Sequence, residues 1–269
     1  MSKRQQLARD AAQKAMKTRI KYELGLADAL CPYDLAEKMG VSVRFFDVPS
    51  MEGMYCKDKQ AIIISSLRPK GRQVFTCAHE LGHHIYGHGN MPDEVQAQSV
   101  HKGRFDEKEY LADCFAGFLL MPKLAVNHAF SKREWDTEKP HISQIYSISN
   151  WFGVGYETLI NHMSYSLKLL SHSYAEKLLK HRPKAIRTRI FPDSASTDLI
   201  CVDEHWSNRA IDIQVNEYIL LPPNVIAEGS NITLIEKSNE RTIYKGIKPG
   251  IGRFYTEYSE WSSFVRISK

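Results

Sequence analysis

The sequence lacks a long apolar run. No stretch approaches the ~20 consecutive apolar residues that a transmembrane helix needs, so a membrane-spanning protein is not expected. The first residues, from Met1 to Gln6, lead into alternating polar residues and alanines, without the apolar core of a signal peptide. Together these two absences predict a cytoplasmic protein that does not associate with membranes.

Cysteine is also scarce. The five cysteines are scattered along the chain, and no two of them form a Cys-x-x-Cys pair. An odd, dispersed set argues against a disulfide framework, so we expect reduced thiols. The net charge of +5 is modest for 269 residues and does not by itself require a nucleic-acid partner. The length predicts one large or two small domains.

The sequence does contain the pentapeptide His79-Glu80-Leu81-Gly82-His83. Two histidines at i and i+4 lie on one face of an α-helix, where their imidazoles can converge on one metal ion. Neutral imidazole nitrogens suit Zn²⁺, and a catalytic zinc takes three protein ligands and leaves one position open. Glu80 is placed to take a proton from a zinc-bound water. The pentapeptide therefore predicts two zinc ligands and a general base.

The surroundings of the pentapeptide favour a buried helix over a chance occurrence. Residues 74–78 are largely apolar, and Leu81 and Ile85 continue an apolar stripe at helical spacing. Polar groups on such a helix need partners, and a metal site supplies them.

The pentapeptide leaves the third ligand open. A metzincin has a third histidine six residues after the second, whereas His88 lies five residues after His83. On a continuing helix His88 would face away from His79, so we interpret it as a helix-end residue. We expect His84 to face solvent or to lie behind the ligands.

Two acidic residues further along the chain are better candidates. Residues 107–122 begin with acids, become strongly apolar at helical spacing and end at Pro122, which predicts a buried helix. Glu109 and Asp113 are four residues apart and share one face of that helix. We prefer Glu109 as the third ligand and Asp113 as the hydrogen-bond partner of a ligand histidine; the reverse assignment stays open. The alternative is that these acids only stabilise the first turn of the helix, where negative charge is favourable. This alternative suits Asp113 poorly, because Asp113 lies within the apolar run.

Two segments in this order resemble the ImmA/IrrE family of zinc metallopeptidases: AHELGH at 78–83, then ADCFA at 112–116 with LLMP at 119–122. The resemblance covers roughly residues 1–165. It implies a zincin-like fold with His79 and His83 as zinc ligands, Glu80 as the base, and a carboxylate, from Glu109 or Asp113, as the third ligand. It also implies a cytoplasmic protease that cleaves a helix-turn-helix repressor and so derepresses mobile-element or stress-response genes.

The N-terminal pattern suits an α+β fold. Helices are expected at residues 3–29 and 32–40, a strand at 41–46, a hairpin of strands at 53–56 and 61–64, and the metal-binding helix from about Lys70. We expect residues 61–65 to form an exposed edge strand that can bind an extended peptide. The polar segment 89–105 is expected to be a loop, either bordering the substrate cleft or simply solvated.

Helices are expected again at 141–151 and 156–170, joined by a glycine turn. Such a pair resembles a DNA-binding helix-turn-helix, but residues 156–159 lack base-reading side chains, so direct DNA binding is not expected. Residues 168–190 are basic and are interpreted as a solvated helix and linker, although an acidic protein surface or a phosphate backbone could also be their partner. Pro183 and Pro192 indicate a domain boundary at 185–195.

Beyond that boundary, short β-like runs separated by turns predict a small β-rich domain. The runs lie at 199–202, 211–215, 218–221, 232–235, 242–244 and 264–267, with 249–252 as turn residues. The expected organisation is therefore a metallopeptidase domain at 1–125, a helical segment and linker at 126–185, and an accessory domain at 190–269.

Two functions from different classes follow from these features. The first is a zinc endopeptidase that cleaves a helix-turn-helix-type repressor. The alternative is a non-proteolytic anti-repressor that has a zincin fold and acts by sequestration. Glu80 favours the first, because a pure binder needs no base beside an open zinc position. A third interpretation is a DNA-binding regulator with a vestigial zincin domain. It is supported only by the helix pair at 141–151 and 156–170 and by the basic segment 168–190.

Overall fold

A computed structural model describes residues 1–89, 91–94, 105–206, 209–257 and 259–269. Its internal contacts separate two compact units. Unit 1 comprises Met1–Ala129 with Phe152–Gly155, and unit 2 comprises Phe130–Trp151 with Tyr156–Lys269. Among the described residues, no helix is both long and apolar enough to cross a membrane.

Unit 1 begins with helix α1 (Lys3–Lys21), which starts at a capping box formed by Ser2 and Gln5. The prediction that this helix reaches residue 29 is wrong, because the chain turns at Glu23, where φ is +55°. Arg19 stabilises the turn through its guanidinium group, which donates to the carbonyls of Gly25 and Asp28. Helix α2 (Pro32–Lys38) follows the turn, with proline in its first turn.

The sheet of unit 1 has four strands in the order β1-β3-β2-β4. They are β1 (Ser42–Phe46), β2 (Met51–Cys56), β3 (Ala61–Ser65) and β4 (Met91–Glu94). β1 runs parallel to β3, whereas β2 is antiparallel to both β3 and β4. The expectation that residues 61–65 form an edge strand is wrong, because β1 and β2 occupy both edges of β3; the sheet edges are β1 and β4.

Segment 89–105 was expected to be a loop, but β4 occupies 91–94 of it. Residue 90 and residues 95–104 lie outside the described part of the chain, so the expected role of this loop beside the cleft stays a prediction.

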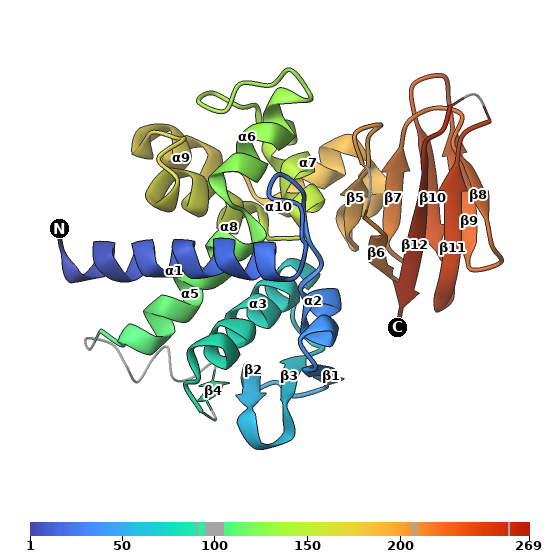
Figure 1. Ribbon diagram of the computed structural model, residues 1–269. Coiled ribbons are helices and arrows are strands. Elements are labelled where there is room, and N and C mark those ends of the chain that lie inside the picture. Colours follow the sequence, from blue (N-terminus) through green and yellow to red (C-terminus); the bar gives the residue numbers. More distant parts are fainter. Residues whose placement is uncertain (90, 95–104, 207–208, 258) are drawn as a thin grey trace. The chain divides into compact units, whose positions relative to one another are not determined.

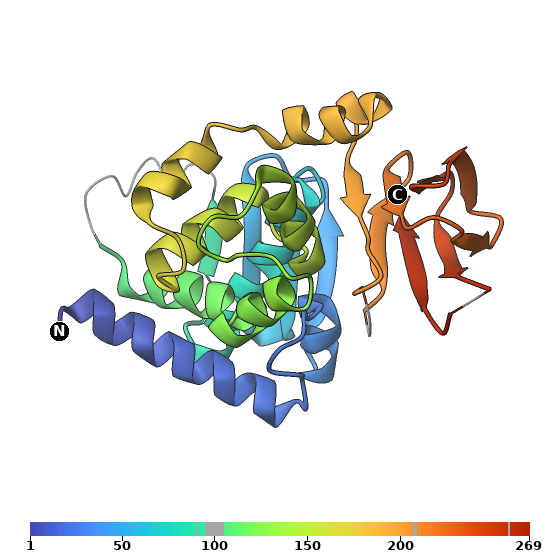
Figure 2. The same cartoon turned by 90° about the horizontal axis from the view of Figure 1, so that it is seen from above.

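Two helices carry the predicted metal ligands. Helix α3 (Lys70–Tyr86) packs on β2 and β3, and helix α5 (Glu107–Leu120) packs against both α1 and α3. Figure 1 shows this arrangement, and Figure 2 shows α1 and α5 from above. Gly82 permits the close approach of α3 to α5, since a Cβ at this position would lie 3.1 Å from Cα of Ala112. Helix α6 (Lys123–Ser131, of which Phe130 and Ser131 group with unit 2) follows Pro122.

Unit 2 contains a helical part and two sheets. Its helices are α7 (Ile142–Phe152, of which Phe152 groups with unit 1), α8 (Tyr156–Asn161), the π-helix His162–Ser166, α9 (His172–Leu179) and α10 (Pro183–Ile190). The predicted helix 156–170 is thus an α-helix continued by a π-helix. The basic segment was interpreted as a helix and linker; the structure has two helices in it, α9 and α10, and Pro183 lies in the first turn of α10, where its missing N–H is not needed.

The two sheets of unit 2 each have four strands, in the orders β5-β7-β10-β9 and β6-β12-β11-β8. The strands are β5 (Leu199–Cys201), β6 (Ile211–Gln214), β7 (Tyr218–Leu221), β8 (Ile226–Glu228), β9 (Ile232–Lys237), β10 (Thr242–Gly246), β11 (Gly250–Tyr255) and β12 (Ser262–Ser268). The rings of Tyr244 and Phe254 lie 5.2 Å apart between the sheets. β8 was not predicted, and the assignment of residues 250–252 to a turn is wrong, because they begin β11.

The whole is a mixed α/β protein with small sheets, as predicted. The three-part division 1–125, 126–185 and 190–269 stays a prediction.

Candidate metal centre

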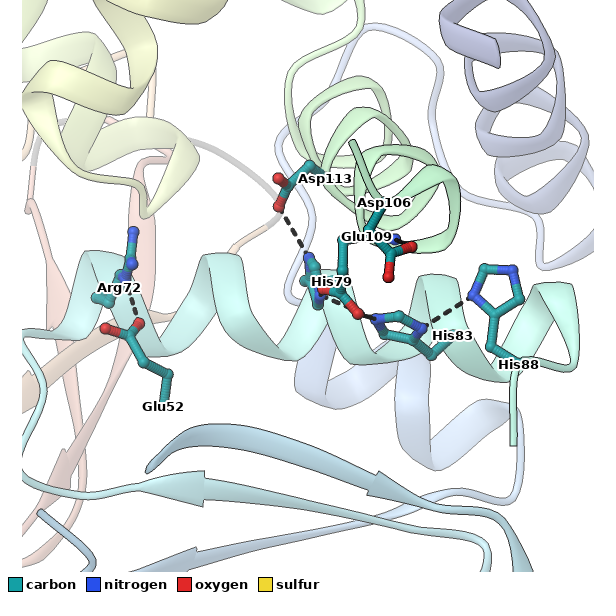
Figure 3. Close-up of polar contacts among 8 residues, drawn as sticks. All are labelled: Glu52, Arg72, His79, His83, His88, Asp106, Glu109 and Asp113. Atoms are coloured by element: carbon teal, nitrogen blue, oxygen red, sulfur yellow. Dashed lines mark hydrogen bonds and ion pairs between the residues drawn. The ribbon is translucent and has the colours of Figure 1, made fainter. Parts of the chain in front are cut away.

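Helix α3 brings His79 and His83 together. Their i, i+4 spacing stacks them on the face of α3 that meets α5, and both are buried, at 5% and 1% exposure. Their Nε2 atoms lie 2.9 Å apart (Figure 3). Two ring nitrogens therefore point into the same small space, as the spacing predicts for a shared metal ion.

Helix α5 supplies the carboxylate. Glu109 Oε2 lies 3.2 Å from Nε2 of His79, and Oε1 lies 3.5 Å from Nε2 of His83. Asp106 caps the helix by accepting hydrogen bonds from the backbone N–H groups of Lys108 and Glu109, which places Glu109 in the first turn. The Glu109 side chain is 37% exposed, so the cluster is open to solvent on this side.

Asp113 lies one helical turn after Glu109 and contacts the other nitrogen of His79. Its Oδ1 is 2.9 Å from His79 Nδ1, so the ring donates its Nδ1–H to this carboxylate. Nε2 of His79 then faces Glu109 and His83. The Asp113 side chain is 60% exposed, so the acid lies at the surface of the helix although its neighbours in sequence are apolar.

The remaining histidines near the cluster lie behind it. His88 follows Gly87, the residue that ends α3 with φ of +69°, and its Nδ1 is 2.9 Å from Nδ1 of His83. His84 is half-buried, and its Nδ1 lies 2.7 Å from the hydroxyl of Tyr55 in β2. Burial lowers the pKa of both rings, and electrostatic interactions lower it further, with His83 and Lys108 for His88 and with Lys21 for His84.

Glu80 is fully buried on α3 and faces strand β2. A Cβ on Gly53 of β2 would lie 3.1 Å from Oε1 of Glu80 and 2.3 Å from Cγ2 of Thr76. β2 therefore approaches the acid closely only because residue 53 has no side chain. Next to Gly53, Glu52 forms an ion pair with Arg72 of α3, which ties the strand to the helix at this level (Figure 3).

The charges within the cluster reinforce one another. Burial alone would lower the pKa of His79, but hydrogen bonds to Asp113 and Glu109 outweigh it and raise this pKa well above its ordinary value. Burial likewise opposes ionisation of Glu109, yet hydrogen bonds from His79 and His83 hold its pKa well below its ordinary range. Glu109 is therefore ionised at neutral pH, which is the form that binds a cation.

The three donors fit a divalent metal. The ligand atoms of His79, His83 and Glu109 all lie within 4.8 Å of one another, and among the described residues this is the single cluster of metal-binding type. In a tetrahedral site with bonds of about 2.0–2.1 Å, neighbouring ligand atoms are about 3.3 Å apart. Nε2 of His79 lies 2.9 Å from Nε2 of His83 and 3.2 Å from Oε2 of Glu109, both close to that value, while the other Glu109 oxygen, Oε1, lies 3.5 Å from Nε2 of His83. Two imidazoles and one carboxylate match the donor set of catalytic zinc sites.

The part of the chain that contains this cluster is similar to a known protein family. Residues 36–164 match a peptidase family model described as "IrrE N-terminal-like domain", and this range includes every residue of the cluster. No curated protein matches the chain. A solved structure described as a Mycobacterium tuberculosis transcriptional regulator is similar, with 20% identity and a TM-score of 0.41. The match covers 58% of this chain and 46% of that one, so the chain corresponds to less than half of that protein.

Proposed function

We propose, from the premise that this chain belongs through residues 36–164 to the ImmA/IrrE family of metallopeptidases, that it is a zinc-dependent endopeptidase. One observation carries the proposal. Donor atoms of His79, His83 and Glu109 converge within 4.8 Å, and Glu80 lies on the same helix as the two histidines. The proposed fold is the zincin-like one that the sequence resemblance implies.

His79, His83 and Glu109 would hold the zinc ion. Asp113 would fix the tautomer and the orientation of His79, because it accepts the proton on Nδ1 and leaves Nε2 free to bind. Zinc, when bound, polarises the scissile carbonyl and makes a water molecule acidic enough to attack it at neutral pH. The protein contributes three fixed donors and one solvent-open side.

Glu80 is the proposed general base. Its carboxylate takes a proton from the attacking water as the new C–O bond forms at the peptide carbonyl carbon. When the C–N bond breaks, the same proton passes to the leaving amine nitrogen, so Glu80 ends the cycle ionised. The close packing of β2 at Gly53 holds this carboxylate against the strand.

The proposed substrate is a helix-turn-helix-type transcriptional repressor, whose cleavage derepresses mobile-element or stress-response genes. The resemblance to the family supports this substrate class, and a repressor bound to chromosomal DNA also favours a cytoplasmic location for the protease. A protein rather than a nucleic acid is the proposed direct partner. A helix-turn-helix gene adjacent to the gene for this chain would supply the candidate for the assay.

The test is the substitution Glu80→Gln, which preserves size but removes the base. We expect zinc to be retained and the cleavage rate to fall by at least ~10²-fold, the low end for a lost general base. Zinc is measured by metal analysis and cleavage by the appearance of repressor fragments. Fragments formed equally fast by the variant and the wild type would overturn the proposal. If the repressor is released from its operator without fragments by both proteins, the non-proteolytic anti-repressor is correct instead.

A further inference from the structure

We infer that His88 is a positioning residue for His83, which accepts the Nδ1–H of that ring and so directs its Nε2 into the metal-binding cluster. The inference rests on the proposed zinc site, since it assigns His83 as a ligand. His88 is not itself part of the cluster, and neither the family match nor the predicted ligand set gives it a role.

The geometry of His83 requires a proton acceptor behind the ring. Nε2 of His83 is the nitrogen that faces the cluster, 2.9 Å from Nε2 of His79 and 3.5 Å from Glu109. To bind a metal, this nitrogen must carry a lone pair, so the proton of the neutral ring has to reside on Nδ1. Nδ1 of His83 points away from the cluster, and Nδ1 of His88 lies 2.9 Å from it.

This contact fixes the tautomers of both rings. Two nitrogens at hydrogen-bond distance share one proton, and His83 supplies it when its Nε2 binds metal. His88 must then accept at Nδ1 and carry its own proton on Nε2. If this acceptor were removed, His83 would lose the bias towards the Nδ1–H tautomer, and the alternative Nε2–H tautomer has no lone pair to offer the metal.

The end of helix α3 delivers His88 to this position. Gly87 adopts φ of +69°, a left-handed conformation that reverses the chain, and the backbone N–H of His88 then donates to the carbonyl of His83 at 3.0 Å. The ring of Tyr86 is stacked on His88, with 5.5 Å between centroids and 13° between planes. The Tyr86 hydroxyl donates to Asp10 of α1. His88 is thus held from its backbone and from one face of its ring, and Figure 3 shows it beside His83.

The two predicted ligand histidines therefore have different partners. His79 donates to the carboxylate of Asp113, whereas His83 donates to a neutral imidazole. A metal-binding histidine usually donates its second N–H to an oxygen acceptor, and removal of that partner typically weakens metal binding by about 10–100-fold. We expect the same range for the loss of the His88 acceptor.

The test compares His88→Leu with His88→Asn. Both substitutions remove the ring and its stacking on Tyr86, and the two new side chains have the same branched shape. Only asparagine keeps an acceptor near the position of Nδ1. The zinc dissociation constant is measured by chelator competition, and the visible spectrum of the cobalt-substituted protein reports the ligand geometry. His84→Leu is the matched control, because His84 contacts Tyr55 and not the cluster.

We expect His88→Leu to weaken zinc binding about 10–100-fold and to alter the cobalt spectrum. His88→Asn and His84→Leu should retain the wild-type affinity. Equal losses in His88→Leu and His88→Asn would overturn the inference, because they would indicate ring packing rather than hydrogen bonding; so would an unchanged affinity in both. These outcomes leave the proposed function intact, whereas a wild-type protein that binds no zinc would overturn the function and the inference together.

Discussion

Two carboxylates on adjacent turns of α5 reach the two nitrogens of one histidine. Glu109 faces Nε2 of His79, and Asp113 faces Nδ1. Because only Nε2 points into the cluster, the two acids have unequal proposed roles although their spacing in sequence made either of them a candidate. The choice between them depends on which side of the imidazole each acid meets, and that choice requires the packing of α5 on α3.

Substitution of each acid by alanine tests these roles. Glu109→Ala removes a proposed ligand and should abolish stoichiometric zinc binding. Asp113→Ala removes only the partner of His79 and should weaken binding by about 10–100-fold. Metal content after dialysis against a series of zinc-buffered solutions measures both effects. If Asp113→Ala lost more zinc than Glu109→Ala, Asp113 would be the ligand and the proposed assignment would be reversed.

The base is constrained by a glycine in another element. Gly53→Ala would place a methyl group 2.3 Å from Cγ2 of Thr76 and 3.1 Å from Oε1 of Glu80. We expect a loss of about 1–3 kcal/mol in the free energy of unfolding, as for other overpacked sites, and a lower kcat with zinc still bound. Urea denaturation and cleavage kinetics measure the two effects separately.

The double variant Gly53→Ala with Thr76→Ser is the control, because serine lacks the clashing methyl group. It should recover stability, and a kcat that stays low in the double variant would assign the catalytic loss to displacement of Glu80. Wild-type stability and kcat in the single variant would show that β2 can move away from α3 without consequence.

The prediction that His88 lies at the end of the helix is confirmed, but its contact with His83 was not predicted. Helical geometry correctly indicates that His79 and His83 share a face. Gly87 ends α3 in a left-handed turn, and this reversal of the chain brings His88 next to His83, which a continuing helix would not do. The signal was present in the sequence as a glycine directly after the apolar stripe. The contact of Gly53 with Glu80 had no comparable signal, since it joins residues 27 positions apart in two elements.

At the scale of elements, helices and strands with a periodic hydrophobic pattern were predictable from the sequence. The ends of elements that are set by contacts with distant residues were not. The strand and helix patterns of residues 32–86 match α2, β1, β2, β3 and α3 closely. β11 was mistaken for a turn because of its glycines. Gly252 lies where the sheets pack closely, since a Cβ there would lie 2.5 Å from Cδ1 of Ile232 and 3.1 Å from the backbone oxygen of Glu228. Likewise, α1 ends at Lys21 because Arg19 binds the backbone that follows.

Arg19 also connects α1 to the metal-bearing helix. It is fully buried, and its Nε donates to the carbonyl of Leu119 at 2.8 Å, at the C-terminal end of α5. The guanidinium thus satisfies carbonyls that a helix end leaves without partners. Since α1 lies outside the matched range 36–164, the family domain alone would lack this support for the helix that carries Glu109.

Arg19→Met should therefore destabilise unit 1. Several buried carbonyls would lose their donor, at about 1–3 kcal/mol for each group left unsatisfied, so we expect a total loss of several kcal/mol in the free energy of unfolding. Lys17→Met, an exposed position on the same helix, is the control and should change stability by less than about 0.5 kcal/mol. Urea denaturation compares the two. Equal midpoints would mean that α1 contributes nothing through this side chain.

At the scale of the whole molecule, all proposed metal ligands lie in unit 1, whereas the predicted boundary at 185–195 lies within unit 2. Arg133 precedes that boundary and Asp203 follows it, yet the buried Arg133 and the partly exposed Asp203 form a bidentate pair with N–O distances of 2.5 and 2.8 Å. Trp151 and Trp206, which also lie on opposite sides of the predicted boundary in the sequence, pack with ring centroids 5.1 Å apart. These contacts join the segments of unit 2 that precede and follow the predicted boundary.

Asp203→Ala tests whether residues 190–269 form a separate module. The substitution would leave the buried guanidinium of Arg133 without this carboxylate. Breaking a fully buried pair typically costs about 3–5 kcal/mol, and we expect a smaller loss here because the Asp203 side chain is 28% exposed. We expect unit 2 to unfold at a lower temperature while zinc affinity stays unchanged, since unit 1 holds every proposed ligand. Calorimetry and chelator competition on the same samples separate the two effects, with the exposed Asp193→Ala as control. An unchanged melting profile would mean that this ion pair does not stabilise unit 2, and a proportionate loss of zinc would mean that the two units unfold as one.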